Sequence, residues 1–131
     1  MDCWAMNTAH KSRLEAAEMR VLRVIRGISL RDRVRSERIR TDLGVEPVLD
    51  CVERNQLRWF GHVRRMEGAE RLRRILVWRP EGRRPAGRPR KRWMESIAEA
   101  VQRRGATMGE LEENRIFADR EIWRRFTRRG T

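Results

Sequence analysis

The segment 79–92 constrains the fold of this chain more than any other stretch of its sequence. It holds three of the four prolines, two glycines, seven basic residues and one acidic residue. Proline ends helices and cannot donate to a β-ladder, and charged side chains are not buried without partners. We therefore expect an extended, exposed basic loop. It would join an N-terminal helical part, residues 1–78, to a C-terminal helical part, residues 93–131.

The charge of the chain is also concentrated in its middle third. The 131 residues include 32 Lys and Arg, 30 of them Arg, against 19 Asp and Glu, for a net charge of +13. The charged fraction is 39%, where about 25% is usual. Residues 51–92 carry fourteen basic and four acidic side chains, whereas the two flanks are nearly balanced. This pattern indicates an anionic partner that is contacted mainly through the middle of the chain.

Several classes of protein are disfavoured by what the sequence lacks. No run approaches the roughly 20 apolar residues that span a bilayer, and the N-terminus lacks the basic and apolar regions of a secretory signal. Cys3 and Cys51 could form only one disulfide, which favours a reducing, intracellular location. These cysteines, with His10 and His62, lack the short paired spacing of a zinc site. We expect no membrane partner, no metal and no cofactor.

Catalysis has little support in the sequence. There is no glycine-rich phosphate cradle followed by Lys and Ser or Thr, and no Gly-x-Ser-x-Gly elbow. The aspartates are scattered among arginines at helical spacing, which is typical of surface ion pairs. We therefore expect a protein that is not an enzyme, with surface ion pairs at Asp32, Asp42, Asp50 and Asp119.

Apolar residues recur at helical spacing along both flanks, and no period-two alternation persists. The fold class predicted is all-α, with five or six short amphipathic helices in two halves. Residues 75–78 could equally form a short strand. The predicted helices cover residues 12–27, 36–43, 47–66 in one or two pieces, 69–78, 93–104 and 107–126.

Capping signals support the first and last of these helices. Ser12 and Glu15 form a potential capping box, and so do Thr107 and Glu110, while Gly27 is a suitable helix end. The apolar face predicted for the first helix consists of Leu14, Ala17, Val21, Val24, Ile25 and Ile28. The face predicted for the last helix consists of Leu111, Ala118, Ile122 and Phe126.

Aromatic side chains lie on or beside the arginine-rich stretches, and each has two readings. Indole faces can stack on bases while guanidinium groups neutralise phosphates, but a small domain without Tyr also needs large apolar groups in its core. We favour core anchors for the tryptophans and a packed position among aromatic rings for His62, which could alternatively contact a phosphate or a base. The tryptophans concerned are Trp59, Trp78, Trp93 and Trp123.

Within the basic loop, Gly87-Arg88-Pro89 and its basic flanks resemble the centre of an AT-hook, which lies extended in the minor groove of DNA. Proline lowers the cost of holding the segment extended, and a narrow minor groove attracts arginine. Ala86 stands where AT-hooks prefer Arg, and a basic hinge between the helical halves is the alternative. The candidate nucleic-acid-binding residues are Arg79, Arg83, Arg84, Arg88, Arg90, Lys91 and Arg92 in the loop, with Arg64, Arg65, Arg73, Arg74, Trp59, His62 and Trp93.

Two motifs at a characteristic separation point to a family. Residues 56–66, QLRWFGHVRRM, are followed by residues 82–93, GRRPAGRPRKRW. Together with residues 13–20, 32–35 and 119–123, they resemble the C-terminal tail of reverse transcriptases from non-LTR (LINE-type) retrotransposons. The resemblance covers nearly the whole chain.

The resemblance implies a nucleic-acid-handling extension without catalytic residues. In the family, the metal-binding aspartates of the polymerase palm lie upstream of this tail, and target nicking belongs to a separate endonuclease domain. Cys3-Trp4 looks like the junction after the polymerase domain, so we expect a detached copy of the tail. The expected partners are DNA or RNA, bound with little sequence specificity, and a polymerase domain, in the nucleus. A helical protein-interaction module and a retroelement relic without a selected role are the alternatives.

Overall fold

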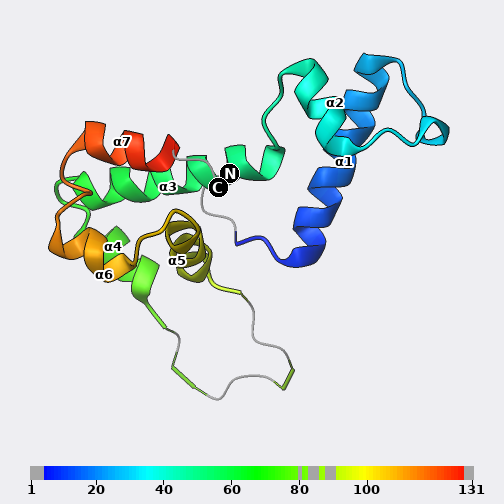
Figure 1. Ribbon diagram of the computed structural model, residues 1–131. Coiled ribbons are helices and arrows are strands. Elements are labelled where there is room, and N and C mark those ends of the chain that lie inside the picture. Colours follow the sequence, from blue (N-terminus) through cyan, green and yellow to red (C-terminus); the bar gives the residue numbers. More distant parts are fainter. Residues whose placement is uncertain (1–4, 80, 83–85, 88–90, 129–131) are drawn as a thin grey trace. The chain divides into compact units, whose positions relative to one another are not determined.

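The computed structural model describes residues 5–79, 81–82, 86–87 and 91–128. These residues are mainly helical and form no strand, so the predicted all-α class is confirmed (Figure 1). They form seven α-helices instead of five or six, because the predicted last helix is divided in two. The helices are α1 (Thr8–Arg26), α2 (Ser36–Leu43), α3 (Val48–Arg65), α4 (Glu70–Val77), α5 (Trp93–Arg103), α6 (Met108–Glu113) and α7 (Arg120–Arg128), with a short 3-10 helix, η1 (Leu30–Asp32), after α1.

The described residues group into two compact units. The first unit comprises residues 6–52, and the second comprises residues 53–128 together with residue 5. The boundary falls within α3, between Val52 and Glu53, and not at residues 79–92, where the sequence suggests a division. The helices on either side of the basic segment, α4 and α5, therefore belong to the same unit.

Helix α1 begins four residues before the capping box that the sequence suggested. Its N-cap is Asn7, whose side-chain oxygen accepts a hydrogen bond from the His10 amide at 2.8 Å. Ser12 consequently lies inside the helix. The predicted end is confirmed, because Gly27 follows the helix with φ of 70°, a conformation that glycine adopts without strain.

The apolar face predicted for α1 is wrong in part, because Leu14 and Ile28 are half-buried but the predicted residues between them are exposed. Val21, Val24 and Ile25 are exposed, whereas Leu22 is buried. The reason is a carboxylate that turns another side of α1 toward α2. Glu18, one helical turn before Leu22, accepts hydrogen bonds from the Arg40 guanidinium at 2.6 Å and from the Val48 amide at 2.9 Å.

Two aspartates of the first unit have different structural roles. Asp42 forms the predicted type of surface ion pair, with its carboxylate 3.0 Å from the Arg26 guanidinium. Asp32 instead caps η1, where it accepts hydrogen bonds from the backbone amide of Ser29 at 2.6 Å and from the Ser29 hydroxyl at 3.0 Å. These two bonds lower the pKa of Asp32 because they favour its charged form.

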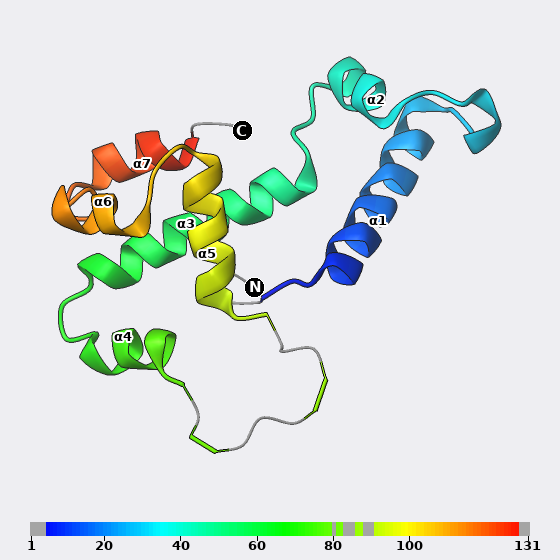
Figure 2. The ribbon, with the colours of Figure 1, turned by 60° about the horizontal axis from the view of Figure 1, so that its bottom comes forward.

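The core of the second unit is built by α3, α5, α6, α7 and the turn that precedes α7. Helix α3 is a single helix, which settles the choice between one helix and two, and α4 is helical where a short strand was the alternative. Figure 2 shows α5 lying across α3. The buried residues of this core are Leu57, Phe60, Ile97, Ala100, Val101, Leu111, Phe117, Trp123 and Phe126.

Helices α7 and α3 approach each other closely at Trp123. The indole N–H of Trp123, a residue only 2% exposed, donates to the Leu57 carbonyl at 3.0 Å. A Cβ atom on Gly61 would stand 2.0 Å from the same indole nitrogen. The absence of a side chain at Gly61 is therefore what allows the indole to reach the backbone of α3.

The capping box before α6 is confirmed. The Thr107 amide donates to the Glu110 carboxylate at 2.8 Å, and the Glu110 amide donates to the Thr107 hydroxyl oxygen at 3.2 Å. The helix nevertheless ends at Glu113, and a turn over residues 114–118 precedes α7.

The break between α6 and α7 changes which residues are buried. The Asp119 carboxylate caps α7 by accepting from the amides of Ile122 at 3.0 Å and Glu121 at 2.7 Å, which lowers its pKa. Ala118 and Ile122, predicted to face the core, are exposed, and Phe117 and Trp123 are buried instead. Asp119 is thus a helix cap and not the surface ion pair that we predicted.

We expect Gly61→Ala to destabilise the fold. The added methyl group meets the buried indole, so the core must shift, and the hydrogen bond to Leu57 is strained or lost. The expected loss in the free energy of unfolding is about 2–4 kcal/mol, from overpacking and an unsatisfied buried donor. Urea denaturation followed by tryptophan fluorescence measures it.

Gly109→Ala is the matched control, because the nearest atom to a Cβ there is the Thr107 hydroxyl oxygen at 4.0 Å. It should leave stability unchanged or raise it by up to about 1 kcal/mol, as alanine is the better helix former. Equal effects of the two substitutions would contradict the proposed packing of Trp123 on Gly61.

Candidate nucleic-acid interface

Four of the predicted phosphate contacts lie outside the described residues. These are Arg83, Arg84, Arg88 and Arg90, so the extended course of the basic segment and its AT-hook-like centre stay predictions. Arg79 is described and exposed, two residues after the end of α4.

The basic segment is tied to α5 at its C-terminal end. Lys91 forms an ion pair with Glu99, and the backbone amide of Arg92 donates to the Glu95 carboxylate at 3.0 Å. Both carboxylates lie on α5, so the last two residues of the segment are held against this helix. Lys91 and Arg92 are both half-buried.

Arg73 has a structural role that the sequence did not reveal. Its guanidinium donates to the carbonyl oxygens of Val63, Arg64 and Met66, at 3.5, 3.2 and 2.6 Å. These carbonyls lie at the C-terminal end of α3, where carbonyl groups lack partners within the helix and the helix dipole attracts cations. Arg73 thereby fastens α4 to the end of α3.

Arg64 and Arg65 are also engaged within the fold. The Arg64 guanidinium lies 3.0 Å from the Glu112 carboxylate and 5.3 Å from the centre of the Phe117 ring. Arg65 donates to the Phe117 carbonyl at 3.0 Å. Partial burial and the neighbouring charge of Arg120 lower the pKa of Arg65.

The aromatic candidates differ in exposure. Trp59 and Trp93 are half-buried and meet edge to face, with ring centres 5.1 Å apart and planes at 87°. His62 is exposed on α3, so its predicted packing among aromatic rings is wrong. Trp123 is the core anchor that we predicted, whereas Trp78, predicted to be another, is 65% exposed.

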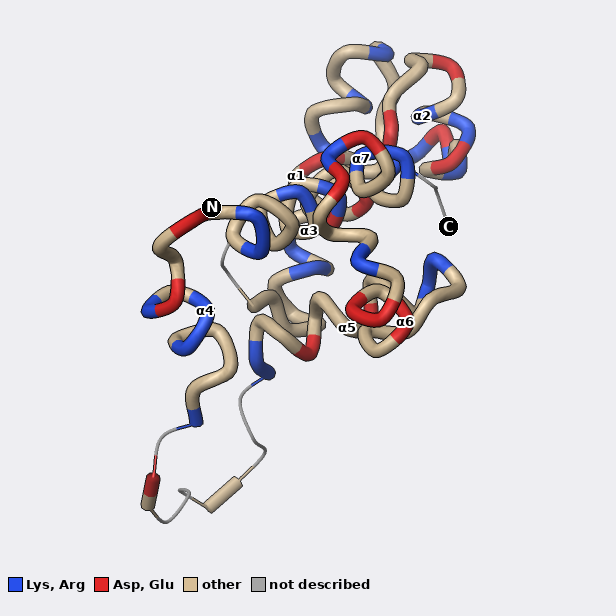
Figure 3. The backbone as a smooth tube through the Cα atoms, turned by 90° about the vertical axis from the view of Figure 1, so that its left-hand side faces the viewer, with Lys and Arg blue, Asp and Glu red and all other residues tan. Residues whose placement is uncertain are grey.

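The structure therefore brings out one residue that the candidate set lacked. Trp78 follows α4 directly, and Arg74 and Arg79 on either side of it in the sequence are exposed as well. Figure 3 shows how basic positions recur along α4 before the chain continues into the basic segment. An exposed indole among guanidinium groups is suited to stacking on a base while phosphates are neutralised.

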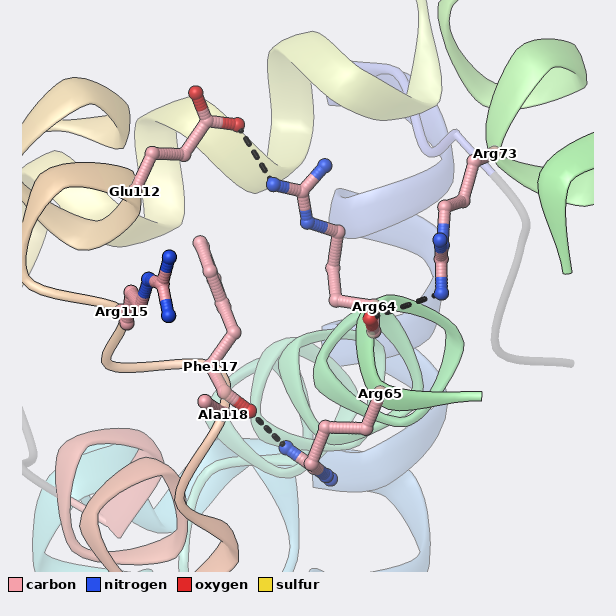
Figure 4. Close-up of a pocket in the computed structure, with 7 residues that line it drawn as sticks. All are labelled: Arg64, Arg65, Arg73, Glu112, Arg115, Phe117 and Ala118. Atoms are coloured by element: carbon pink, nitrogen blue, oxygen red, sulfur yellow. Dashed lines mark hydrogen bonds and ion pairs between the residues drawn. The ribbon is translucent and has the colours of Figure 1, made fainter. Parts of the chain in front are cut away.

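A pocket of about 610 Å³ lies beside the C-terminal end of α3 (Figure 4). Among the predicted site residues, it brings together Arg64, Arg65 and Arg73. It adds Arg115, which no sequence signal singled out because the turn over residues 114–118 was predicted to be helical. The remaining lining residues are Glu112, Phe117 and Ala118.

Within the described part of the chain, no group of three or more His, Cys, Asp or Glu side chains is arranged to hold a metal ion. No helix of the described residues is long and apolar enough to cross a membrane.

Comparison of the chain with models of protein families, with curated proteins and with solved structures finds no match.

We expect Arg73→Gln to loosen α4 from α3. The substitution removes a charged donor from three carbonyl groups at a helix end, and we expect a loss of about 1–3 kcal/mol in the free energy of unfolding. Arg74→Gln, an equal charge change at an exposed position of the same helix, should stay within about 0.5 kcal/mol of the unmodified chain. Urea denaturation of both variants tests this, and equal stabilities would remove the structural role of Arg73.

Proposed function

We propose that this chain is a non-catalytic nucleic-acid-binding fragment related to the tail of LINE-type reverse transcriptases, acting in the nucleus. It contacts phosphate backbones through the arginine-rich segment 79–92. The observation that carries the proposal is the exposed Trp78, which lies between the exposed Arg74 and Arg79 at the start of that segment. An apolar ring 65% exposed to water has no evident role in packing.

The chemistry of the region supports binding without sequence readout. Arginine presents a planar fork of donors that matches phosphate oxygens, and residues 51–92 carry ten more basic than acidic side chains. Phosphate contacts position a protein on a nucleic acid but carry no sequence information. Every base has a face on which an indole can stack. The proposal therefore covers DNA and RNA, with little discrimination among sequences.

The salt dependence of binding tests the basic segment. If each of its seven cations neutralises one phosphate of duplex DNA, log K against log salt has a slope of about −6. Replacing Arg83, Arg84, Arg88 and Arg90 with Gln should make the slope shallower by about 3 to 4. Fluorescence anisotropy with a labelled duplex, titrated at several salt concentrations, measures both slopes.

The matched control removes the same amount of charge from exposed positions of the first unit. A slope shallower than about −2 for the unmodified chain, or equal losses in the two quadruple variants, would rule out segment 79–92 as the main contact. The control substitutions are Arg13→Gln, Arg20→Gln, Arg31→Gln and Arg38→Gln.

Trp78→Ala tests the stacking contact. One base–indole contact contributes about 1–3 kcal/mol, so affinity for a short single-stranded oligonucleotide should fall roughly five-fold to 150-fold. Ile75→Ala is the control, because Ile75 is equally exposed on α4 but has no aromatic ring. It should leave affinity unchanged in the same anisotropy assay. An unchanged affinity for Trp78→Ala would contradict the stacking contact.

A protein-interaction module is the second candidate, and one observation favours it. Helix α1 exposes Val21, Val24 and Ile25, which are 58%, 76% and 64% accessible. An apolar strip of this kind suits docking to another protein, and the partner that the sequence resemblance suggests is a polymerase domain. The quadruple substitution in segment 79–92 separates the two candidates, because unchanged nucleic-acid affinity favours docking.

A further inference from the structure

The pocket beside the end of α3 is lined by more cationic than anionic side chains. Guanidinium groups of Arg64, Arg65, Arg73 and Arg115 line it, against the single carboxylate of Glu112. All of these residues belong to the second unit. The volume of about 610 Å³ is within the range of small-ligand sites.

Three of the arginines are held in place by the fold. Arg73 is fixed by carbonyl groups of α3 and its end, Arg65 by the Phe117 carbonyl, and Arg64 by Glu112. A guanidinium has five N–H donors, so each keeps donors beyond those that these contacts use. Positioned cations with remaining donors are preorganised for an anion.

The Arg115 side chain is not held by such contacts. Its backbone follows the end of α6 with a φ of 48°, and the amides of Arg115 and Ile116 donate to the carbonyls of Glu112 and Leu111 at 3.2 and 3.1 Å, a pattern typical of a helix end. Among the described residues, its guanidinium makes no hydrogen bond or ion pair, and the residue is exposed. In Figure 4 the Phe117 ring stands between the guanidinium groups of Arg115 and Arg64.

We infer that this pocket binds a phosphate group of a nucleic acid, an inference that rests on the proposed function. Phosphate offers more acceptor oxygens than a carboxylate and can engage guanidinium groups on both sides of Phe117. The pKa of Arg65 is lowered mainly by burial and further by the charge of Arg120. Arginine nevertheless stays protonated at neutral pH.

Glu112 is the competitor that an incoming phosphate must displace. Its ion pair with Arg64 is 3.0 Å long, and the two side chains are 54% and 35% exposed, so the carboxylate can turn outward into water. Removal of the Glu112 charge should therefore favour the phosphate. Removal of the Arg115 charge should disfavour it.

Calorimetric titration of the full chain with pyrophosphate, in about 0.15 M salt to screen distant charges, tests the pocket. Arg115→Asn removes the cation but keeps a residue that tolerates positive φ, and should weaken binding roughly tenfold. Glu112→Gln should tighten binding several-fold. Arg13→Gln, an exposed charge change on α1, is the control and should have little effect. Thermal melts by circular dichroism verify that each variant is folded.

The proposed phosphate site would be overturned if Arg115→Asn bound pyrophosphate as tightly as the unmodified chain. It would also be overturned if Arg115→Asn and Arg13→Gln weakened pyrophosphate binding equally. A titration with a single-stranded oligonucleotide then identifies the source of the phosphate. Weaker oligonucleotide binding by Arg115→Asn supports a nucleic-acid phosphate, and an effect confined to pyrophosphate overturns that assignment in favour of a free phosphate compound. A failure of the proposed function alone gives a different result. In that case the quadruple variant of segment 79–92 keeps its affinity for the oligonucleotide, while Arg115→Asn still weakens the binding of pyrophosphate.

Discussion

The contact of Trp123 with the backbone of α3 is the constraint on which the second unit depends. The indole lies where Gly61 has no side chain and donates its N–H to the Leu57 carbonyl at 3.0 Å. This places α7 against α3, and the ring extends the aromatic cluster through Phe117, whose centre is 4.9 Å away. Phe117 in turn lies beneath Arg64, so the pocket is positioned by the same packing that forms the core.

The arginines of this chain have two different roles. Some guanidinium groups complete the fold, as Arg73 does at the carbonyl end of α3 and Arg40 does at Glu18. Others, such as Arg74 and Arg79, stand exposed near the basic segment. A net charge of +13 therefore overstates the charge that faces a partner. Cations that are engaged within the fold add to the electrostatic potential that attracts an anionic partner. Exposed cations can also contact that partner directly.

Local signals in the sequence predicted the helical class and several helix ends, because caps such as Thr107 and end glycines such as Gly27 act within one turn. Contacts between residues far apart in the sequence determine features of the fold that these local signals did not predict. The buried side of α1 depends on Glu18, thirty residues before its partner Val48. The break after α6 is a local turn in which Arg115 takes a left-handed conformation that more often falls to glycine, so no residue signals it in the sequence. The pocket that Arg115 lines could therefore not be predicted from periodicity.

The position of Glu18 has a consequence for how the first unit opens. One carboxylate holds both Arg40 of α2 and the first amide of α3. Neither contact can be kept if α1 moves away, so release of α2 and fraying at the start of α3 are one event. We therefore expect the first unit to open cooperatively, with Glu18 as the acceptor that α2 and α3 share, and not as three helices that fray independently.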